Sequence, residues 1–476
     1  MRTIYDTFRL RADISPDSTA IIDDGGRLSY AGLSDLVDRI AAEMPVQRPR
    51  VVGVVMSHGR RMIATLLAVL KKGAAYMPVE PDFPAARIKY CLEQSGADLL
   101  VTDHGYQVLG PRKTPDADTD SPLAYILFTS GTTGRPKGVM VTNANVLHYV
   151  RAFSNEFHQG PGDVMLQYSV CSFDIFTEEV FTTLLSGAAL AIAPKSARKS
   201  VGRLIDFMRK TGVTIVTGFP YLLLELDKEA GRLPASLRLL ISGGDVLRLG
   251  YVEHLIDRLP VYNTYGPSET TVCATYQRCR RADALDDGTF PIGHPVTGAR
   301  VEILDDNLQP VPDGTEGEIC ISGGGVFAGY IGNARAAAKT LLDIPGRGRL
   351  YRSGDMGIRR PDGSLLFRHR RDSQVMIMGK RVEPDEVQNV LCDIDGIEAG
   401  VVRAATDNRG LAYLTAYVVP KGSFNFSAQR VRRLLARMLP PYMIPDFIVR
   451  LARMPLTANG KVDTAALPLV PKKVEA

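Results

Sequence analysis

Several features that would place this chain in a special class are missing from it. Its six cysteines form no CxxC pair and have no histidine cluster beside them, so a disulfide framework or a zinc site is not expected. No run of 18 apolar residues occurs, and the N-terminal segment lacks the apolar core of a signal peptide. The sequence therefore predicts a soluble, cytoplasmic protein that does not bind membranes.

Charge and composition exclude further classes. The net charge of +5 is spread along the chain and forms no basic tail, which does not support nucleic-acid binding and weakly favours an anionic small-molecule substrate. Neither a repeat nor a low-complexity segment is present, and a hydrophobic content of 45% is ordinary for a folded protein. Because 476 residues exceed what one compact core usually holds, we expect two or more domains.

The first 370 residues alternate short β-branched runs with longer helical patterns. VVGVVM (51–56) precedes an amphipathic pattern, RRMIATLLAVLKKG (60–73), and DLLVTD (98–103), VTIVTGFP (213–220) and LRLLISGGD (237–245) are further apolar runs beside helical segments. This alternation predicts βαβ units around buried, largely parallel sheets.

The pattern changes near residue 372. GIRRPDGSLLF (357–367) predicts a hairpin, and the basic stretch RHRRDS (368–373) predicts a hinge. Beyond it we expect a helix at 382–394, a strand at 410–419 and a helix at 427–443 that two prolines end. The prediction is an α/β protein with a large N-terminal domain (1–371) and a small α+β C-terminal domain (372–476).

A loop rich in glycine, threonine and basic residues follows an apolar run at 129–138, TSGTTGRPKG. Its glycines let backbone N–H groups face an anion, while the hydroxyls, Arg135 and Lys137 add donors and charge. A polyphosphate is the ligand that this composition favours. The spacing does not match a Walker P-loop, which needs four residues between its glycines and a GK[ST] ending.

The loop resembles the ATP loop of the adenylate-forming superfamily, which includes acyl-CoA synthetases, luciferases and the adenylation domains of nonribosomal peptide synthetases. Other segments that resemble the family occur in its order: RLSYAGL (27–33), LKKGAAYMPVEPDFP (70–84), FDIFTEEVF (173–181), NTYGPSETTVCAT (263–275), YRSGDMG (351–357), RRDSQVMIMGKRVEPDEV (370–387) and PLTANGKVD (455–463). LKKGAAYMPVEP and NTYGPSETT favour the peptide-synthetase adenylation domains. The resemblance spans nearly the whole chain.

That resemblance implies a fold of several N-terminal subdomains with a small, mobile C-terminal domain. It also implies a reaction in which a carboxylate attacks the α-phosphate of Mg-ATP, releases pyrophosphate, and passes the acyl group to a thiol. Such a displacement requires positioning and charge neutralisation rather than a protein nucleophile. ATP and Mg²⁺ are thus the expected cofactors, and a carrier protein with a phosphopantetheine thiol is the expected partner.

By position in the family motifs, two residues are expected to take part in catalysis. Lys461 in ANGKVD would stabilise charge in the adenylation step, and Glu269 would hold the metal, since Mg²⁺ prefers oxygen ligands. Tyr265 would stack on adenine and Asp355 would accept the ribose hydroxyls. The expected ATP-binding residues are Thr129, Ser130, Gly131, Thr132, Thr133, Lys137, Gly244, Asn263, Tyr265, Ser268, Asp355 and Arg370.

Asp372 matches the family hinge, at 370–372, about which the small domain would swing between two poses. The second pose would bring the loop around Gly379 against the active site as part of a tunnel for the thiol arm. Two residues depart from the family pattern, because His369 stands where glycine is usual and Met376 where lysine is usual. The hinge and carrier contacts therefore follow less directly from the resemblance than the ATP site does.

The expected amino-acid pocket begins with Asp174, which matches the residue that pairs with the substrate ammonium in α-amino-acid-activating members. Asp174 as a helix cap is an alternative that is compatible with this role. The remaining pocket residues implied by the resemblance are Ile175, Glu178, Thr217, Ile241, Gly243, Thr264, Val272 and Cys273.

Glu178 leaves two interpretations of the substrate. If the segment is helical, Asp174 and Glu178 lie on one face, and a substrate with a second positive group, such as a diamino acid or a β-amino relative, would relieve their repulsion. Alternatively, Glu178 turns outward or bonds Thr217 around a neutral substrate. A short β-amino acid with its amine at Asp174 is a third possibility.

Two rival functions also fit parts of the pattern. An acyl-CoA ligase would share the fold but usually lacks an aspartate at position 174, and a non-catalytic binding subunit would not be expected to keep Thr133, Glu269, Asp355 and Lys461. No carrier or condensation motif occurs in these residues. A free-standing enzyme and a piece of a larger synthetase are both compatible with the sequence, which also does not identify a helper protein.

Overall fold

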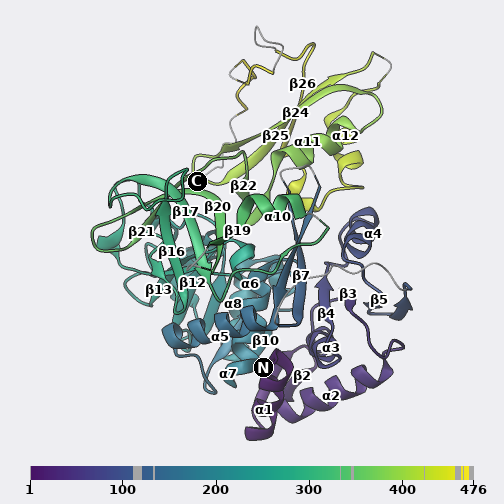
Figure 1. Ribbon diagram of the computed structural model, residues 1–476, viewed down its shortest axis with the longest axis vertical. Coiled ribbons are helices and arrows are strands. Elements are labelled where there is room, and N and C mark those ends of the chain that lie inside the picture. Colours follow the sequence, from purple (N-terminus) through teal and green to yellow (C-terminus); the bar gives the residue numbers. More distant parts are fainter. Residues whose placement is uncertain are drawn as a thin grey trace. The chain divides into compact units, whose positions relative to one another are not determined.

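The computed structural model describes residues 2–110, 121–131, 135–332, 334–344, 348–422, 424–455, 462–464 and 466–470 (Figure 1). The chain divides into two compact units. The first comprises residues 1–81, 92–127 and 138–371, and the second comprises 82–91, 128–137 and 372–476. The domain limits expected from the sequence stay a prediction, and two short segments from the first third of the chain group with the C-terminal residues.

A nine-stranded sheet of the first unit has the order β15-β14-β13-β12-β11-β9-β10-β1-β2. Its inner pairs, from β13 through β12, β11, β9 and β10 to β1, are parallel, and its edge pairs are antiparallel. The strands are β1 (Thr19–Asp23), β2 (Gly26–Ser29), β9 (Val164–Gln167), β10 (Ala189–Ile192), β11 (Ile215–Gly218), β12 (Leu239–Ser242), β13 (Val261–Tyr265), β14 (Thr275–Cys279) and β15 (His294–Pro295).

A seven-stranded sheet has the order β18-β8-β7-β4-β3-β5-β6, with parallel pairing of β7, β4, β3 and β5. Its strands are β3 (Val51–Val55), β4 (Ala75–Pro78), β5 (Leu99–Thr102), β6 (Gly105–Val108), β7 (Leu123–Thr129), β8 (Lys137–Thr142) and β18 (Gly329–Tyr330). Both sheets confirm the expected α/β class, because helices connect buried parallel strands.

A third sheet is antiparallel and consists of β16 (Ala299–Leu304), β17 (Glu316–Gly323), β19 (Leu341–Ile344), β20 (Gly348–Arg359) and β21 (Leu365–Arg370). β20 and β21 form the expected hairpin. The first three residues of the basic stretch at 368–373 extend β21, and the role of this stretch as a hinge stays a prediction.

The α-helices that begin before residue 372 are α1 (Ile4–Ile14), α2 (Tyr30–Glu43), α3 (Arg60–Lys71), α4 (Ala85–Gln94), α5 (Asn143–Phe157), α6 (Asp174–Thr177), α7 (Thr183–Ser186), α8 (Val201–Thr211), α9 (Pro220–Lys228) and α10 (Ala334–Thr340). α3 is buried more completely than an amphipathic pattern requires, because every residue from Met62 to Leu70 is buried. A helix covered on all sides needs no polar face. One large core cluster joins α1, β4, α5 and the residues after α6 through Phe8, Tyr76, Phe153 and Phe181.

The second unit contains a three-stranded sheet of β24 (Ile397–Thr406), β25 (Ala412–Pro420) and β26 (Phe447–Arg450), and a two-stranded ribbon of β22 (Val375–Ile377) and β23 (Lys380–Val382). Its helices include α11 (Pro384–Cys392) and α12 (Ala428–Leu435), together with the greater part of α4. α12 ends five residues before Pro440, earlier than expected, because Met438 N–H and Leu439 N–H both bond the Leu435 carbonyl in a tightened turn.

Candidate active site

The threonine- and glycine-rich loop lies between β7 and β8, as a strand-to-loop segment. Thr129 ends β7, Ser130 and Gly131 are buried, and Lys137 begins β8. A Cβ atom at Gly131 would lie 2.2 Å from the Arg135 carbonyl oxygen, so only glycine fits there. Thr132 and Thr133 lie outside the described residues.

Asp355 and Arg370 are brought together by the register of the β20–β21 hairpin, in which they are directly opposite residues. Arg370 Nη1 donates to Asp355 Oδ1 at 2.5 Å, and the hydroxyl of Tyr265, at the end of β13, donates to Oδ2 at 2.6 Å. The Asp355 side chain is therefore charge-balanced and oriented by two neighbours. Burial, with the Asp355 charge next to it, raises the pKa of Tyr265 well above its ordinary value.

Gly244 follows strand β12, and Asn263 lies within the neighbouring parallel strand β13. Gly244 has a φ of 77° and is exposed. Asn263 in β13 is buried, and its Nδ2 donates to the Pro291 carbonyl at 2.9 Å. Both residues thus occupy the carboxyl-terminal side of the parallel strands, where ligands bind in open α/β sheets.

Glu269 lies in a 3₁₀ turn, Ser268–Thr270, directly after β13. Its side chain is fully buried and accepts a hydrogen bond of 2.6 Å from the Tyr330 hydroxyl. A buried carboxylate is a hard oxygen donor, and its charge adds to the rise in the pKa of Asp174. The donor chemistry therefore fits a divalent cation such as Mg²⁺.

Asp174 is the first residue of α6, and Phe173 occupies the capping position, so the interpretation of Asp174 as a helix cap is wrong. The helix continues into a π-helical turn, Glu178–Thr182. Burial raises the pKa of Asp174 to about 6, and the Glu269 charge contributes to the rise. Within the described part of the chain, no lysine or arginine forms an ion pair with Asp174 or Glu178.

Glu178 is 2% exposed and faces two hydroxyl groups. Thr217 Oγ1 donates to its Oε1 at 2.5 Å, and the Tyr149 hydroxyl donates to its Oε2. Glu178 thus does not turn outward, whereas the expected alternative bond to Thr217 is confirmed, and the neutral substrate that went with it stays a prediction. Burial still raises the pKa of Glu178 to about 7, although both hydroxyl contacts oppose the rise. Two neutral donors do not offset the cost of burying this charge.

Among the remaining pocket residues, Ile175 lies in α6, and the others lie in strands β12 and β13 or in the segments that follow them. Ile175, Ile241, Gly243, Thr264, Val272 and Cys273 are all buried. A Cβ atom at Gly243 would lie 2.6 Å from Thr264 Oγ1, which explains the glycine. Val272 has a φ of 71°, a strained conformation for a β-branched residue and one that tends to occur at functional sites.

Sequence reasoning missed Tyr149 in α5 and Tyr330 in β18, the hydroxyl partners of the two buried glutamates. Tyr149 lies 29 residues before Glu178, and Tyr330 lies 61 residues after Glu269, so no local spacing signals either contact. An isolated tyrosine in an apolar helix pattern reads as a core residue. Only the fold shows that each has a polar partner.

Four further expected positions lie between residues 369 and 379. Asp372 begins the C-terminal stretch of the second unit, and Gly379, with a φ of 72°, forms the turn between β22 and β23. Met376 lies in β22, and exposed His369 contacts Glu316 at 3.3 Å. Lys461 lies outside the described residues. No helix among the described residues is both long and apolar enough to cross a membrane.

Comparison with known proteins identifies the family. The AMP-binding enzyme family matches residues 8–121 and 109–331, and the C-terminal domain of AMP-binding enzymes matches residues 386–461. The chain is 38% identical to bacitracin synthase 2 of Bacillus licheniformis and 34% identical to tyrocidine synthase 1 of Brevibacillus parabrevis, in each case over 98% of this chain. It spans only 18% and 45% of those proteins, respectively.

A solved structure of holo-PA1221, an NRPS protein containing adenylation and PCP domains, has the same fold. It matches with a TM-score of 0.84 and 27% identity, over 98% of this chain and 83% of that chain. The chain therefore belongs to the AMP-binding enzyme family and is an adenylation domain of the nonribosomal peptide synthetase type, an AMP-forming ligase that activates an amino acid.

Proposed function

We propose that this enzyme joins an amino acid that carries a second positive group to AMP, and then passes the aminoacyl group to the phosphopantetheine thiol of a carrier protein. The observation that carries the substrate class is the pair of carboxylates, Asp174 and Glu178, which lie at the two ends of α6 and have no cationic partner among the described residues. A substrate with two ammonium groups supplies both missing charges.

The nucleotide side of the reaction would be held by groups that the protein already orients. Asp355, fixed by Arg370 and Tyr265, would accept the ribose hydroxyls, because each of its two oxygens can accept a second hydrogen bond beside the one that it already has. The loop at 129–137 would supply backbone N–H and hydroxyl groups to the phosphates. Bound Mg²⁺, which Glu269 would hold, supplies neutralisation of phosphate charge.

Lys461 would contact the substrate carboxylate and the α-phosphate together. The carboxylate oxygen forms a bond to phosphorus while the bond from phosphorus to the bridging oxygen breaks, and pyrophosphate leaves. A lysine ammonium next to the negative charge that develops in the transition state lowers the barrier electrostatically, without forming a covalent bond. Asp372 would be the hinge that moves the C-terminal domain away from this position before thiol transfer, when Gly379 lines the thiol tunnel.

The bonds from Thr217 and Tyr149 to Glu178 favour a second candidate, a neutral amino acid or a short β-amino acid. In that case the protein keeps both hydroxyls on Glu178, and a protonated Glu178 needs no substrate cation. The pKa of about 7 allows either state near neutral pH. The diamino acid is favoured because its second ammonium would balance a buried carboxylate charge that two neutral hydroxyls leave uncompensated.

Amino-acid-dependent exchange of pyrophosphate with ATP tests the proposal most directly. The assay should include ornithine, lysine, diaminobutyrate, arginine, β-lysine and neutral amino acids of similar length. We expect the highest kcat/KM for a diamino acid, and loss of exchange in Lys461→Ala. Transfer to a holo carrier without turnover of free coenzyme A separates the proposal from an acyl-CoA ligase. A neutral amino acid preferred over every diamino acid would contradict the substrate class.

A further inference from the structure

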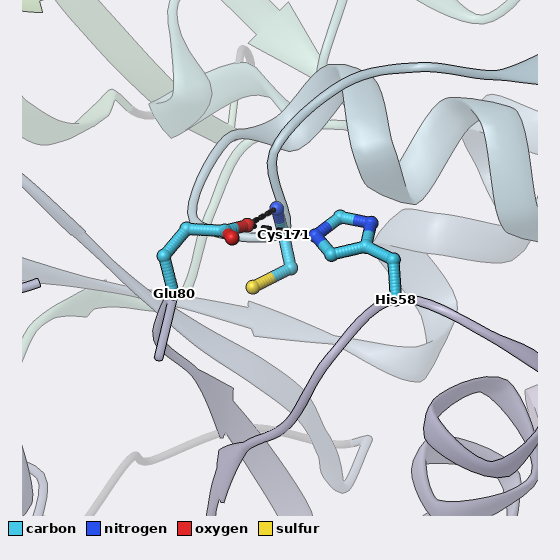
Figure 2. A group of neighbouring side chains, drawn as sticks. All are labelled: His58, Glu80 and Cys171. Carbon is cyan, nitrogen blue, oxygen red and sulfur yellow. Dashed lines mark hydrogen bonds and ion pairs between the residues drawn. The ribbon is translucent and has the colours of Figure 1, made fainter. Parts of the chain in front are cut away.

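A buried group of polar side chains lies beside the loop that leads from β9 to Asp174. His58, Glu80 and Cys171 come from three distant parts of the chain, and their possible ligand atoms lie within 4.8 Å of one another (Figure 2). Because no histidine lies near Cys171 in the chain, sequence spacing does not predict this arrangement. All three belong to the first compact unit.

Glu80 joins the other two residues. Its Oε1 accepts from His58 Nε2 at 2.8 Å and from the Cys171 backbone N–H at 2.6 Å. Figure 2 shows the imidazole facing the carboxylate, with Cys171 engaged through its backbone nitrogen. These contacts hold the pKa of Glu80 at about 2, against the effect of burial, so Glu80 is ionised.

A second buried carboxylate holds the opposite part of the same loop. Glu179 accepts from the backbone N–H groups of Tyr168, at 3.2 Å, and Ser169, at 3.0 Å. Gln167 Nε2 donates to Glu179 at 2.9 Å, and Gln167 Oε1 lies 3.0 Å from His58 Nδ1. Three backbone N–H groups within four residues are thus fixed by two carboxylates that His58 and Gln167 connect.

The loop held in this way ends at Asp174, three residues after Cys171. The His58 ring also packs edge-on against Phe176 in α6, with ring centroids 5.6 Å apart. The helix that begins with Asp174 is therefore supported both through its preceding loop and through its own first turn.

A metal ion fits this group less well than hydrogen bonding does. Arg198 Nη2 lies 3.3 Å from His58 Nδ1 and donates to Gln167 Oε1 at 2.9 Å, which places a guanidinium charge beside the ring. Burial also raises the pKa of the Cys171 thiol well above its ordinary value, and a thiol binds metal as the thiolate. The hydrogen bonds of His58, Glu80 and Glu179 instead hold the loop that precedes Asp174.

We propose that His58 and Glu80 are positioning residues that fix the Cys171 backbone and so aim Asp174 at the substrate amine. This inference rests on the proposed role of Asp174 in amine binding. A displaced carboxylate weakens the pairing with the ammonium, while the ATP site at Asp355 and Glu269 keeps its own partners. Misplacement by about 1 Å can cost about 100-fold in rate, so a loosened loop is expected to be measurable.

The test compares Glu80→Ala, Glu80→Gln and His58→Gln with the intact enzyme by pyrophosphate exchange, using the amino acid that gives the highest kcat/KM. We expect the KM for that amino acid to rise about tenfold in Glu80→Ala, with the KM for ATP and kcat changed less than threefold. Glu80→Gln keeps an acceptor oxygen for Cys171 and should recover part of the loss.

Asp163→Asn is the matched control. Asp163, like Glu80, is 8% exposed, and it pairs with Arg238 at 2.7 Å. It directly precedes β9 and so lies at the other end of the strand that leads to the loop. It should lower the melting temperature without raising the KM for the amino acid. This variant separates loss of buried charge from loss of loop position.

Combination with Asp174→Asn gives a measurement that a purely structural role would not affect. If Glu80 acts through Asp174, Glu80→Ala adds no further rise in KM once Asp174 is changed. Multiplying effects, a parallel rise in the KM for ATP, or a stoichiometric transition metal that His58→Gln removes would overturn the inference. If Asp174→Asn leaves the amino-acid KM unchanged, the proposed role of Asp174 has failed instead.

Discussion

Asp355, in the middle of β20, and the pair Asp174–Glu178, at the two ends of α6, are carboxylates of one compact unit, but their surroundings differ. Asp355 has an arginine and a tyrosine hydroxyl within 2.6 Å, whereas Asp174 and Glu178 have hydroxyl contacts and pKa values raised to about 6 and 7. A carboxylate whose charge is already balanced suits neutral ribose hydroxyls. Carboxylates that lack a balancing charge suit a cationic ligand.

Among the changes that test this comparison, Asp174→Ala should have the largest effect on kcat/KM for the amino acid. The change removes the acceptor for the substrate amine, and kcat/KM for the amino acid should fall roughly 100- to 1,000-fold. Pyrophosphate exchange over a range of amino-acid concentrations measures it, and the KM for ATP serves as the internal control. An unchanged kcat/KM for the amino acid would contradict the assignment of Asp174 to the amino-acid pocket.

Asp355→Asn tests the balanced carboxylate. The amide cannot accept from both the ribose hydroxyls and Arg370 as the carboxylate does, so the KM for ATP should rise about 100-fold. The KM for the amino acid should stay within threefold. Equal effects on both substrates would mean that the two groups of carboxylates do not act separately.

Glu178→Gln keeps the shape of the side chain and removes its charge. If the substrate carries a second ammonium, kcat/KM for the diamino acid should fall about 10- to 30-fold relative to a neutral amino acid of similar length. Tyr149→Phe, which leaves the charge and removes one hydroxyl, is the matched control. Full retention of the diamino-acid preference in Glu178→Gln would end the cationic interpretation.

The effect of pH on amino-acid binding should be smaller than the effects of these substitutions. Below its pKa of about 6, Asp174 is protonated and neutral, so it no longer attracts an ammonium group. The KM for the amino acid should therefore rise as pH falls, by about tenfold between pH 7 and pH 5. Asp174→Asn should lose this part of the pH dependence and keep only the part that Glu178, with a pKa of about 7, contributes. A flat profile for the unchanged enzyme would contradict the assigned pKa.

Much of the fold could be predicted because its signals are local. β3, β5, β11 and β12 are short apolar runs next to helical patterns, and the β20–β21 hairpin follows from a Pro-Asp-Gly turn. The end of α12 could not be predicted, since the local turn at Leu435 rather than the prolines ends it. The buried environment of α3 was equally hidden, because burial depends on what packs against a helix.

The family motifs in the sequence identify the kind of residue at each expected site position, since a hydroxyl, carboxylate or lysine brings its chemistry wherever it lies. Their electrostatic state depended on the tertiary structure. Arg370 lies 15 residues from Asp355 and meets it through strand register, and Tyr149 reaches Glu178 from another helix. His58, which follows β3, reaches the Asp174 loop through Glu80. Charge, burial and hydrogen bonding act through space, and the fold alone sets those distances.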